Sequence, residues 1–231
     1  MIICLLFRIT RKFTMPSRRR FLLAACVASL SLGLSPVAEG SAAVVHSRSA
    51  SVVQRAALPG IGVEVPTTMT AVDVPLEVDG VLVKVNLRGR MRQRTEVLPG
   101  ESPNQAVRLR TIAFHLEGET ADGGLRVMFD LDGADASPAS TLRVRSNFPP
   151  SLEETDVVAL VATIRRAGQP EIALHSARPA VLTATLSVFP PRGDDYQLEN
   201  PVDFVVPGTA TPIARLLALP ARRGGNVLSP Q

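Results

Sequence analysis

Tryptophan is absent from this chain of 231 residues, and a single tyrosine stands beside eight phenylalanines. Stacking platforms for single-stranded nucleic acid or for sugar rings need exposed aromatic side chains, so this scarcity argues against a nucleic-acid-binding protein and against a lectin-type site. Cysteine is nearly absent too, because Cys4 and Cys26 are its only occurrences. The remainder of the chain has no thiol, which excludes disulfides, cysteine-ligated metals and thiol catalysis from it.

An excess of charge is also lacking outside the first residues. The formal net charge is +4, but residues 1–43 contain six basic side chains and one acidic side chain, a net charge of +5. Residues 44–231 therefore contain 19 basic and 20 acidic side chains, a net charge of −1. The composition excludes a coiled coil, a collagen-like chain, a disulfide scaffold and a disordered acidic tail.

Sequence motifs of common enzyme classes are missing as well. The histidines are His46, His115 and His175, and no two of them have the His-x-x-x-His spacing of a zinc protease. The sequence has no Gly-x-Ser-x-Gly elbow, no phosphate-binding loop and no Gly-x-Gly-x-x-Gly fingerprint. A Ser–His–Asp set or a carboxylate pair that only folding brings together stays open, because such sites are defined by geometry.

One motif stands near the start of the chain. Residues 17–23 read Ser-Arg-Arg-Arg-Phe-Leu-Leu, and they are followed by a short apolar stretch and by Gly40-Ser41-Ala42-Ala43. This order is typical of a cleavable signal. The segment resembles the twin-arginine export signal, and the residues that match are Arg18, Arg19, Phe21 and Leu22. The resemblance implies export in the folded state by the twin-arginine machinery, cleavage by signal peptidase after Ala43, and a periplasmic, cell-envelope or extracellular location.

Alternatives for this signal segment stay open. Met15 offers a second possible start of the chain, and Leu23-Ala24-Ala25-Cys26 also matches a lipobox in which Cys26 would carry the lipid. An uncleaved anchor would need about 20 apolar residues, and the stretch Phe21–Ala38 is short and rich in serine for that purpose. We expect cleavage, which leaves no stable membrane span.

Short apolar runs separated by Pro, Gly and Asp begin at Leu58, after a polar linker over residues 44–57. The runs predicted to be strands are Val72–Val78, Val81–Arg94, Val107–Glu119, Leu125–Leu131, Thr141–Ser146, Val157–Arg165, Glu171–His175, Val181–Phe189 and Pro201–Val206. Short strands at close spacing predict an all-β fold, a single antiparallel β-sandwich or barrel-like domain over residues 58–207. A helical signal segment over residues 1–43 would precede this domain, and a C-terminal tail over 208–231 would follow it.

The first two long strands can be placed in register from their apolar residues. Setting Leu87 opposite Leu116 and Met91 opposite Ile112 brings the apolar side chains of both strands to one face. The same register places Arg88 opposite His115 on the other face.

Alternate positions on that other face carry basic side chains. In a strand, residues two apart face the same way, so Arg88, Arg90, Arg92 and Arg94 share a face, and the predicted register leaves the last three without an acid opposite. Arg108 and Arg110 lie near the same hairpin end. Guanidinium groups bind carboxylate, sulfate and phosphate through paired hydrogen bonds, so these six arginines are the candidate anion-binding residues. The alternative is a solvated strand face whose like charges discourage edge pairing.

An acidic turn supplies the candidate metal ligands Asp130, Asp132 and Asp135. The segment resembles part of a calcium loop, but the position that needs a bidentate glutamate is Thr141. An EF-hand is therefore excluded, a looser Ca²⁺ turn stays open, and an Asp-Gly hairpin turn is the ordinary explanation.

A Phe-Pro-Pro sequence followed by an acidic pair occurs twice, at residues 148–154 and 189–195. Proline cannot donate a hydrogen bond to a strand ladder, so we expect both copies to be strand exits. A pair of acidic sites is the alternative.

The favoured interpretation is an exported, non-catalytic binding or cell-envelope module, with the arginine face meeting an anionic envelope polymer or protein and with no required cofactor. The first alternative is a secreted hydrolase with a triad or a carboxylate pair assembled only in the fold, which His115 or His175 beside both a serine and an aspartate would favour. The second is a purely structural or assembly module, which an arginine face buried against acids would favour.

Overall fold

The computed structural model describes residues 56–133 and 136–224. The signal segment lies outside these residues, and so do its residues Arg18, Arg19, Phe21, Leu22, Cys26 and Ala43. The described residues form β-strands and contain no helix. No element in this part of the chain qualifies as a helical membrane span.

The strands, in chain order, are β1 (Glu64–Val78), β2 (Val81–Glu96), β3 (Ala106–Thr120), β4 (Leu125–Leu131), β5 (Thr141–Asn147), β6 (Pro150–Val158), β7 (Leu160–Arg166), β8 (Ile172–Ser176), β9 (Ala180–Leu186), β10 (Arg192–Leu198), β11 (Val202–Val205), β12 (Pro212–Leu216) and β13 (Ala221–Gly224). They make one antiparallel sheet of 13 strands, which confirms the all-β prediction.

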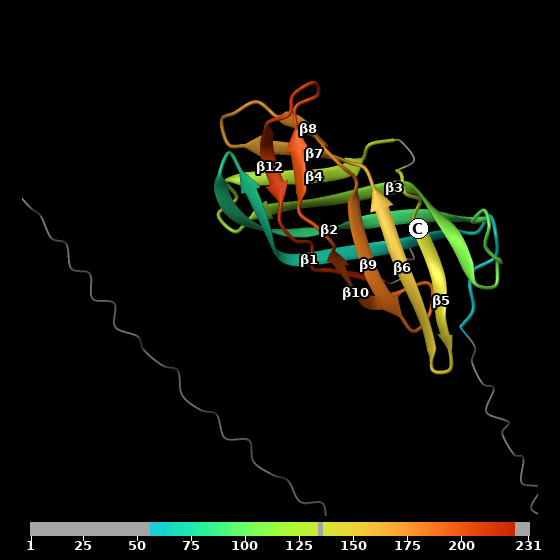
Figure 1. The fold of residues 1–231 in the computed structure, drawn as a ribbon. Helices are drawn as coiled ribbons and strands as arrows, with labels where there is room; N and C mark the ends of the chain where they lie inside the picture. Colours follow the sequence, from blue (N-terminus) through green and yellow to red (C-terminus); the bar gives the residue numbers. More distant parts are fainter. Residues whose placement is uncertain (1–55, 134–135, 225–231) are drawn as a thin grey trace, which may run out of the picture. The chain divides into compact units, whose positions relative to one another are not determined.

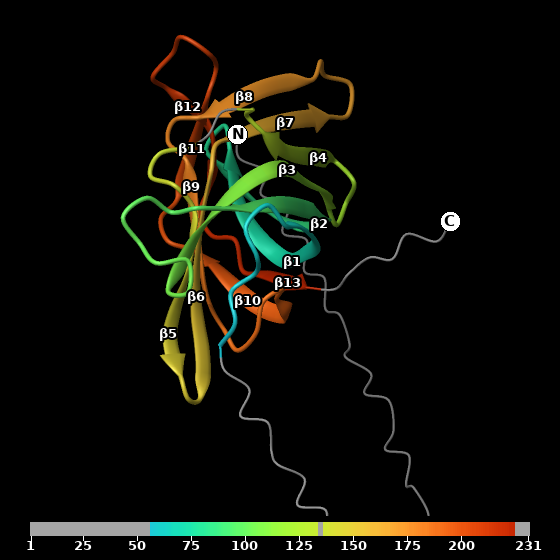
Figure 2. The same ribbon diagram turned by 90° about the vertical axis from the view of Figure 1, so that its right-hand side faces the viewer.

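Two additional pairings, β12 with β1 and β3 with β5, close the sheet into two circuits. The first, here called the apolar circuit, runs β1–β2–β3–β4–β7–β8–β11–β12 and back to β1. The second, the polar circuit, runs β1–β2–β3–β5–β6–β9–β10–β13 and back to β1. Both circuits share β1, β2 and β3. The two views show β4, β7, β8 and β12 towards one end and β5, β6 and β10 towards the other (Figures 1 and 2).

The long strand β1 bends, yet its buried side chains stay on the inward face. A tight turn to β2 and a β-bulge within β1 account for this. Asp79 and Gly80 join β1 to β2 with φ of 50° and 76°, the left-handed pair of a type I′ hairpin turn. A β-bulge interrupts β1 between Ala71 and Val74, and Asp73 takes a φ of 54° there. The Asn86 side-chain oxygen accepts the Asp73 backbone N–H at 2.9 Å. The bulge keeps both Ala71 and Val74 buried, so β1 can serve both circuits.

The interiors of the two circuits differ in chemistry. The apolar circuit is filled by aliphatic and aromatic side chains, among them Leu76, Leu116, Phe129 and Phe204, and the Phe129 and Phe204 rings lie 5.5 Å apart. The polar circuit also has a hydrophobic lining, but it encloses fully buried Glu154, Asp156 and Arg223 as well. Alternation of buried and exposed residues marks the strands of both circuits.

Most strands with a clear apolar alternation were predicted, and several strands without one were missed. β4 has the predicted bounds Leu125–Leu131, and β2, β3 and β5 begin within one residue of the prediction. Strands β6, β10, β12 and β13 and the first half of β1 were not predicted. Segments such as Ala221–Gly224, with sequence Ala-Arg-Arg-Gly, lack the apolar alternation on which strand prediction depends. The tail does not begin at 208, because β12 and β13 belong to the sheet.

The predicted register between β2 and β3 was wrong by two residues. Met91 pairs with Phe114 and Arg90 pairs with His115, whereas the prediction placed Arg88 opposite His115. A shift of two residues preserves the face of each side chain, so the division into an inward apolar face and an outward basic face holds from Val85 to Arg92 and for their partners. A register shift between Arg92 and Gln93 reduces the displacement to one residue for the pairs that follow. The two Phe-Pro-Pro segments do follow the ends of β5 and β9, and their acidic halves then begin β6 and β10.

Candidate anion-binding site

Thr68 and Thr70 lie on the outward face of β1, with arginines on both sides. On one side, Thr68 pairs with Arg90 and Thr70 with Arg88, both from β2. On the other side, Thr70 pairs with Arg222 of β13. Gly224 of β13 separates Thr68 from Arg192 of β10. The strand register thus places the short side chains of Thr68 and Thr70, here called the floor, between two groups of arginines.

Surface hollows lie on both sides of this floor. One, of about 610 Å³, is lined by Thr68 and Thr70 together with Arg192, Arg222 and neighbouring prolines. The other, of about 620 Å³, is lined by the same two threonines together with Arg88, Arg90 and His115. Both hollows share Thr68 and Thr70, so they adjoin each other on the outward face of β1 and are treated together as one surface. We call it the arginine trough and define it by Thr68, Thr70, Arg88, Arg90, Arg192 and Arg222.

The arginines of the trough are weakly neutralised. Arg222 meets Asp195 at 3.2 Å, but both side chains are 71% exposed, and a pair so open to water contributes little. Glu117 lies near Arg88, yet Arg126 holds its carboxylate at 2.7 Å and lowers its pKa through that hydrogen bond. Among the described residues, no ion pair involves the side chain of Arg90 or Arg192, although Asp194 Oδ2 accepts the Arg192 backbone N–H at 2.6 Å. Within this part of the chain, the four trough arginines thus lack buried or closely held acidic partners of their own.

The other arginines of the predicted face are paired with acids. Arg92 and Arg94 both contact Glu64, and the Arg94 hydrogen bond lowers the pKa of that glutamate. Arg108 and Arg110 each lie 3.7 Å from Glu96. The register predicted from the sequence left Arg92 and Arg94 without an acid, because it did not include residues 64–71 in a strand. Of the six predicted anion-binding residues, Arg88 and Arg90 are the two in the trough.

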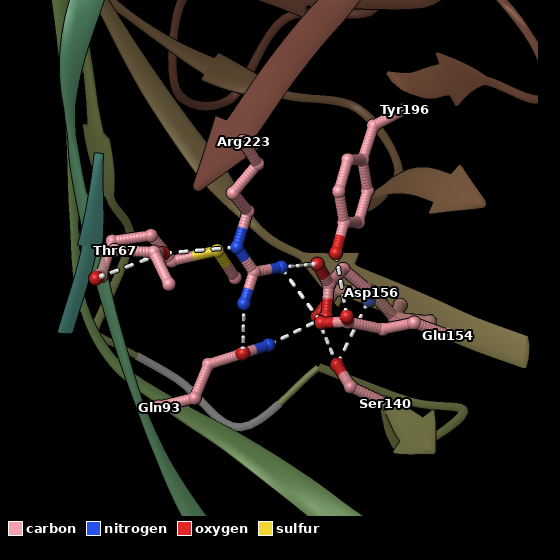
Figure 3. Close-up of polar contacts among 9 residues, drawn as sticks. Thr67, Gln93, Ser140, Glu154, Asp156, Tyr196 and Arg223 are labelled. Carbon is pink, nitrogen blue, oxygen red and sulfur yellow. Dashed lines mark hydrogen bonds and ion pairs between the residues drawn. The ribbon is translucent and has the colours of Figure 1, made fainter. Parts of the chain in front are cut away.

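A buried polar cluster lies inside the polar circuit (Figure 3), and two of its residues, Thr67 and Arg223, directly precede or follow the trough residues Thr68 and Arg222 in the chain. Its residues come from five strands: Thr67, Gln93, Glu154, Asp156, Tyr196 and Arg223. Arg223 is at its centre, and one terminal nitrogen, Nη1, donates to Glu154 Oε1 at 2.7 Å and to Asp156 Oδ2 at 2.6 Å.

The rest of the guanidinium is satisfied as well. Its Nε donates to Thr67 Oγ1 at 2.9 Å, and Nη2 donates to the Gln93 side-chain oxygen. The Tyr196 hydroxyl donates to Glu154 Oε2 at 2.6 Å, and the guanidinium lies 5.0 Å from the centre of the Tyr196 ring. A buried charge is tolerated only when paired and hydrogen-bonded in this way.

Proton affinities in the cluster follow from burial. Burial raises the pKa of the Asp156 carboxyl well above its ordinary 3.8, and the like charge of Glu154 raises it further, against the opposing attraction of Arg223. Burial by itself lowers the pKa of Arg223, but the two carboxyls more than offset this, so the guanidinium stays charged. Burial also raises the pKa of the Tyr196 hydroxyl, which keeps it a donor.

The cluster positions the trough rather than binding a ligand itself. Arg223, Glu154 and Asp156 have no solvent-exposed area, so a solute cannot reach them in this structure. Arg223 sits next to Arg222 in β13, and its contacts tie this short strand to β1, β2 and β6. The backbone of Arg222 is therefore held at a fixed distance from Arg88.

The two predicted metal ligands that the structure describes, Asp130 and Asp132, contact different histidines. Asp130 Oδ1 lies 2.7 Å from His115 Nδ1, and Asp132 Oδ2 lies 3.0 Å from His175 Nδ1. Asp135 lies outside the described residues. Within residues 56–133 and 136–224, no group of three His, Cys, Asp or Glu side chains has the arrangement needed to hold a metal ion.

The histidine contacts bear on the hydrolase alternative. Each histidine has an aspartate partner, but for neither of them does the described part of the chain give a serine hydroxyl within hydrogen-bond distance. Both histidine side chains are about 40% exposed, at 39% and 41%. A Ser–His–Asp arrangement around His115 or His175 is therefore not formed among these residues.

Sequence reasoning missed four residues of the trough: Thr68, Thr70, Arg192 and Arg222. The sequence patterns that could have indicated them are weak: threonines at positions 67, 68 and 70, and an Arg-Arg pair at 222–223. Neither pattern indicates a site until β1, β10 and β13 are known to be neighbours in the sheet.

Comparisons with known proteins bear on the fold. Protein families give no match to this sequence, and curated proteins give none either. Among solved structures, the chain is similar to DynF from the dynemicin biosynthesis pathway of Micromonospora chersina, with a TM-score of 0.54 and 20% sequence identity. The match covers 74% of this chain and 83% of that chain. At this identity the likeness shows a shared fold.

Proposed function

We propose that this protein is an exported, non-catalytic binding module that holds an anionic ligand in the arginine trough. The observation that carries the proposal is the placement of Arg88 and Arg90 on one side of the Thr68–Thr70 floor and of Arg192 and Arg222 on the other. Guanidinium groups form paired, charge-assisted hydrogen bonds with carboxylate, sulfate or phosphate, and the Thr70 hydroxyl adds a neutral donor, whereas the Thr68 hydroxyl already donates to the Gly224 carbonyl oxygen.

Export rests on the resemblance of residues 17–43 to a twin-arginine signal, and cleavage after Ala43 would release the folded domain. An anionic component of the cell envelope is then the natural partner, because an exported protein meets envelope polymers first. Binding through surface arginines in an open depression needs no cofactor.

For the fold, we propose two barrels that share β1, β2 and β3 in place of a two-sheet sandwich. Closure of both hydrogen-bonded circuits supports this arrangement, since a closed circuit removes the free strand edges that a sandwich leaves. The barrels would then supply a rigid support for a site on their common wall.

A paired-variant experiment tests the binding proposal. The variant Arg88→Ser/Arg90→Ser removes one side of the trough, and Arg92→Ser/Arg94→Ser removes the same amount of charge from the same strand outside it. Both variants are run beside the unmodified protein on a carboxylate matrix and on a phosphate matrix, at low ionic strength and then with rising salt.

We expect the Arg88/Arg90 variant to elute at clearly lower salt than the Arg92/Arg94 variant, because Glu64 already neutralises the second pair. Equal elution of the two variants would show that retention reports net charge alone, and the trough proposal would then fail. Far-ultraviolet circular dichroism of each variant checks that the fold is retained.

A further inference from the structure

The trough has two separated groups of cations, and the distance between the groups restricts which ligands can contact both. Arg88 and Arg222 both pair with Thr70, so their backbones are two strand spacings apart, about 10 Å. Arg90 and Arg192 are three strand spacings apart, about 14 Å. Along β2, Arg88 and Arg90 are two residues apart, about 7 Å. Each group can thus take its own anion.

We infer that the trough is bivalent and binds an acidic polysaccharide, whose carboxylate or sulfate groups recur along an extended chain that crosses β1. This inference rests on the anion-binding function proposed above. One acidic group of the chain contacts Arg88 and Arg90, and a second contacts Arg192 and Arg222. The sugar between them lies over Thr68 and Thr70, whose hydroxyls are short enough to leave room and polar enough to hydrogen-bond sugar hydroxyls.

An acidic peptide fits this surface less well. Extended peptides commonly bind by adding a strand to a free sheet edge. The backbone of β1 at Thr68 and Thr70 is already paired with β13 on one side and with β2 on the other. The trough therefore offers a peptide no backbone ladder.

Single-stranded nucleic acid fits less well too. Its binding sites combine cations with aromatic side chains on which bases stack. No Phe or Tyr side chain lines either hollow of the trough. The same absence disfavours neutral sugars, which need stacking, and leaves the charged groups of an acidic polysaccharide as the basis of recognition.

Bivalency can be tested by chain length. The probes are fragments of an alternating glucuronate–N-acetylglucosamine polymer: one fragment with a single carboxylate, and longer ones with several. The carboxyl-reduced polymer serves as the neutral control. Affinities are measured by titration calorimetry for the full chain and for three variants: Arg88→Ser/Arg90→Ser, Arg192→Ser/Arg222→Ser, and the combination of all four substitutions.

A bivalent site binds the longer fragments at least about tenfold more tightly than the single-carboxylate fragment, because the second contact is intramolecular. Either double variant should lose this length dependence and bind long and short fragments alike, within about twofold. The fourfold variant should lose binding of both. The Arg92→Ser/Arg94→Ser variant should keep the full length dependence.

The outcomes separate this inference from the function on which it rests. Equal affinity for short and long fragments in the unmodified protein, together with loss of binding in the fourfold variant, overturns bivalency and leaves a simple anion site. Binding that survives in the fourfold variant overturns the anion-binding function itself. Tighter binding of an acidic peptide or of single-stranded DNA at equal charge would assign the trough to that class of partner and refute the polysaccharide.

Discussion

At the scale of single residues, Arg223 shows how one side chain organises a region that looks unremarkable in sequence. It is fully buried, it bonds to residues on β1, β2 and β6, and its neighbour Arg222 points to solvent. Two adjacent arginines thus have opposite roles, one in the core and one in the trough. A strand places consecutive side chains on opposite faces, which is the reason for the division.

Replacing Arg223 by methionine should destabilise the fold by about 3–5 kcal/mol, because Glu154 and Asp156 would remain buried without a counter-charge. The added replacements Glu154→Gln and Asp156→Asn, which keep the shape and remove the charge, should restore much of this loss. Urea unfolding followed by circular dichroism measures both. A triple variant less stable than Arg223→Met would contradict this account of the cluster.

The destabilisation of the Arg223→Met variant should depend on pH, and the sign of this dependence follows from the pKa of Asp156. Its pKa is higher in the folded chain than the ordinary 3.8, so the folded state binds the proton more tightly than the unfolded state does. This contribution to stability is fully present below the ordinary value and is lost as the pH rises through the folded pKa. The destabilisation of Arg223→Met should accordingly be smallest in acid and increase towards neutral pH.

At the scale of elements, the three shared strands depend on glycines at their closest approach. Gly89 stands between the inward-facing Leu87 and Met91, and a Cβ added there would lie 1.9 Å from the His115 carbonyl oxygen. A Cβ on Gly118 would lie 2.0 Å from the Asn86 carbonyl oxygen. Backbone atoms cannot yield as a flexible side chain can, so both positions exclude any larger residue.

Gly89→Ala should therefore lower the free energy of unfolding by about 1–3 kcal/mol, the usual range for overpacking. Gly60→Ala is the matched control, because its added Cβ would meet its nearest atom, on Val63, at an ordinary 3.7 Å. The control should change stability by less than about 0.5 kcal/mol. Thermal unfolding of the two variants side by side makes the comparison, and an equal loss in both would refute the steric explanation.

At the scale of the whole molecule, both circuits are closed by strands from the C-terminal part of the chain. β12 connects β11 to β1, and β13 connects β10 to β1. Residues distant in sequence therefore complete the wall that carries the trough. The buried cluster contributes to the second closure through Arg223.

A chain that ends at Val206 lacks β12 and β13, so it should leave both circuits open and fail to unfold cooperatively. It would expose apolar interior and free strand edges, and we expect dye binding and aggregation. A chain that ends at Gly224 keeps every strand of the sheet and should unfold like the full chain. Cooperative unfolding of the shorter chain would show that circuit closure is dispensable, against the proposed pair of barrels.

Sequence patterning determined the fold class and the faces of the strands. Period-two alternation in stretches such as Leu125–Leu131 is local, and it distinguishes inside from outside even where the register is displaced, as between β2 and β3. The outward basic face of Arg88 to Arg94 was predictable for the same reason. A strand whose inward position is charged, such as β13 with Arg223, gives no such signal.

Only the tertiary structure decided which arginines are neutralised and which form the trough. Glu64, in the part of β1 that alternation did not reveal, neutralises Arg92 and Arg94. Arg192 and Arg222 join Arg88 around Thr70 through pairings between strands far apart in sequence. The physical reason is that the energy of a charge depends on its neighbours in space, whereas alternation records only the side to which each residue points.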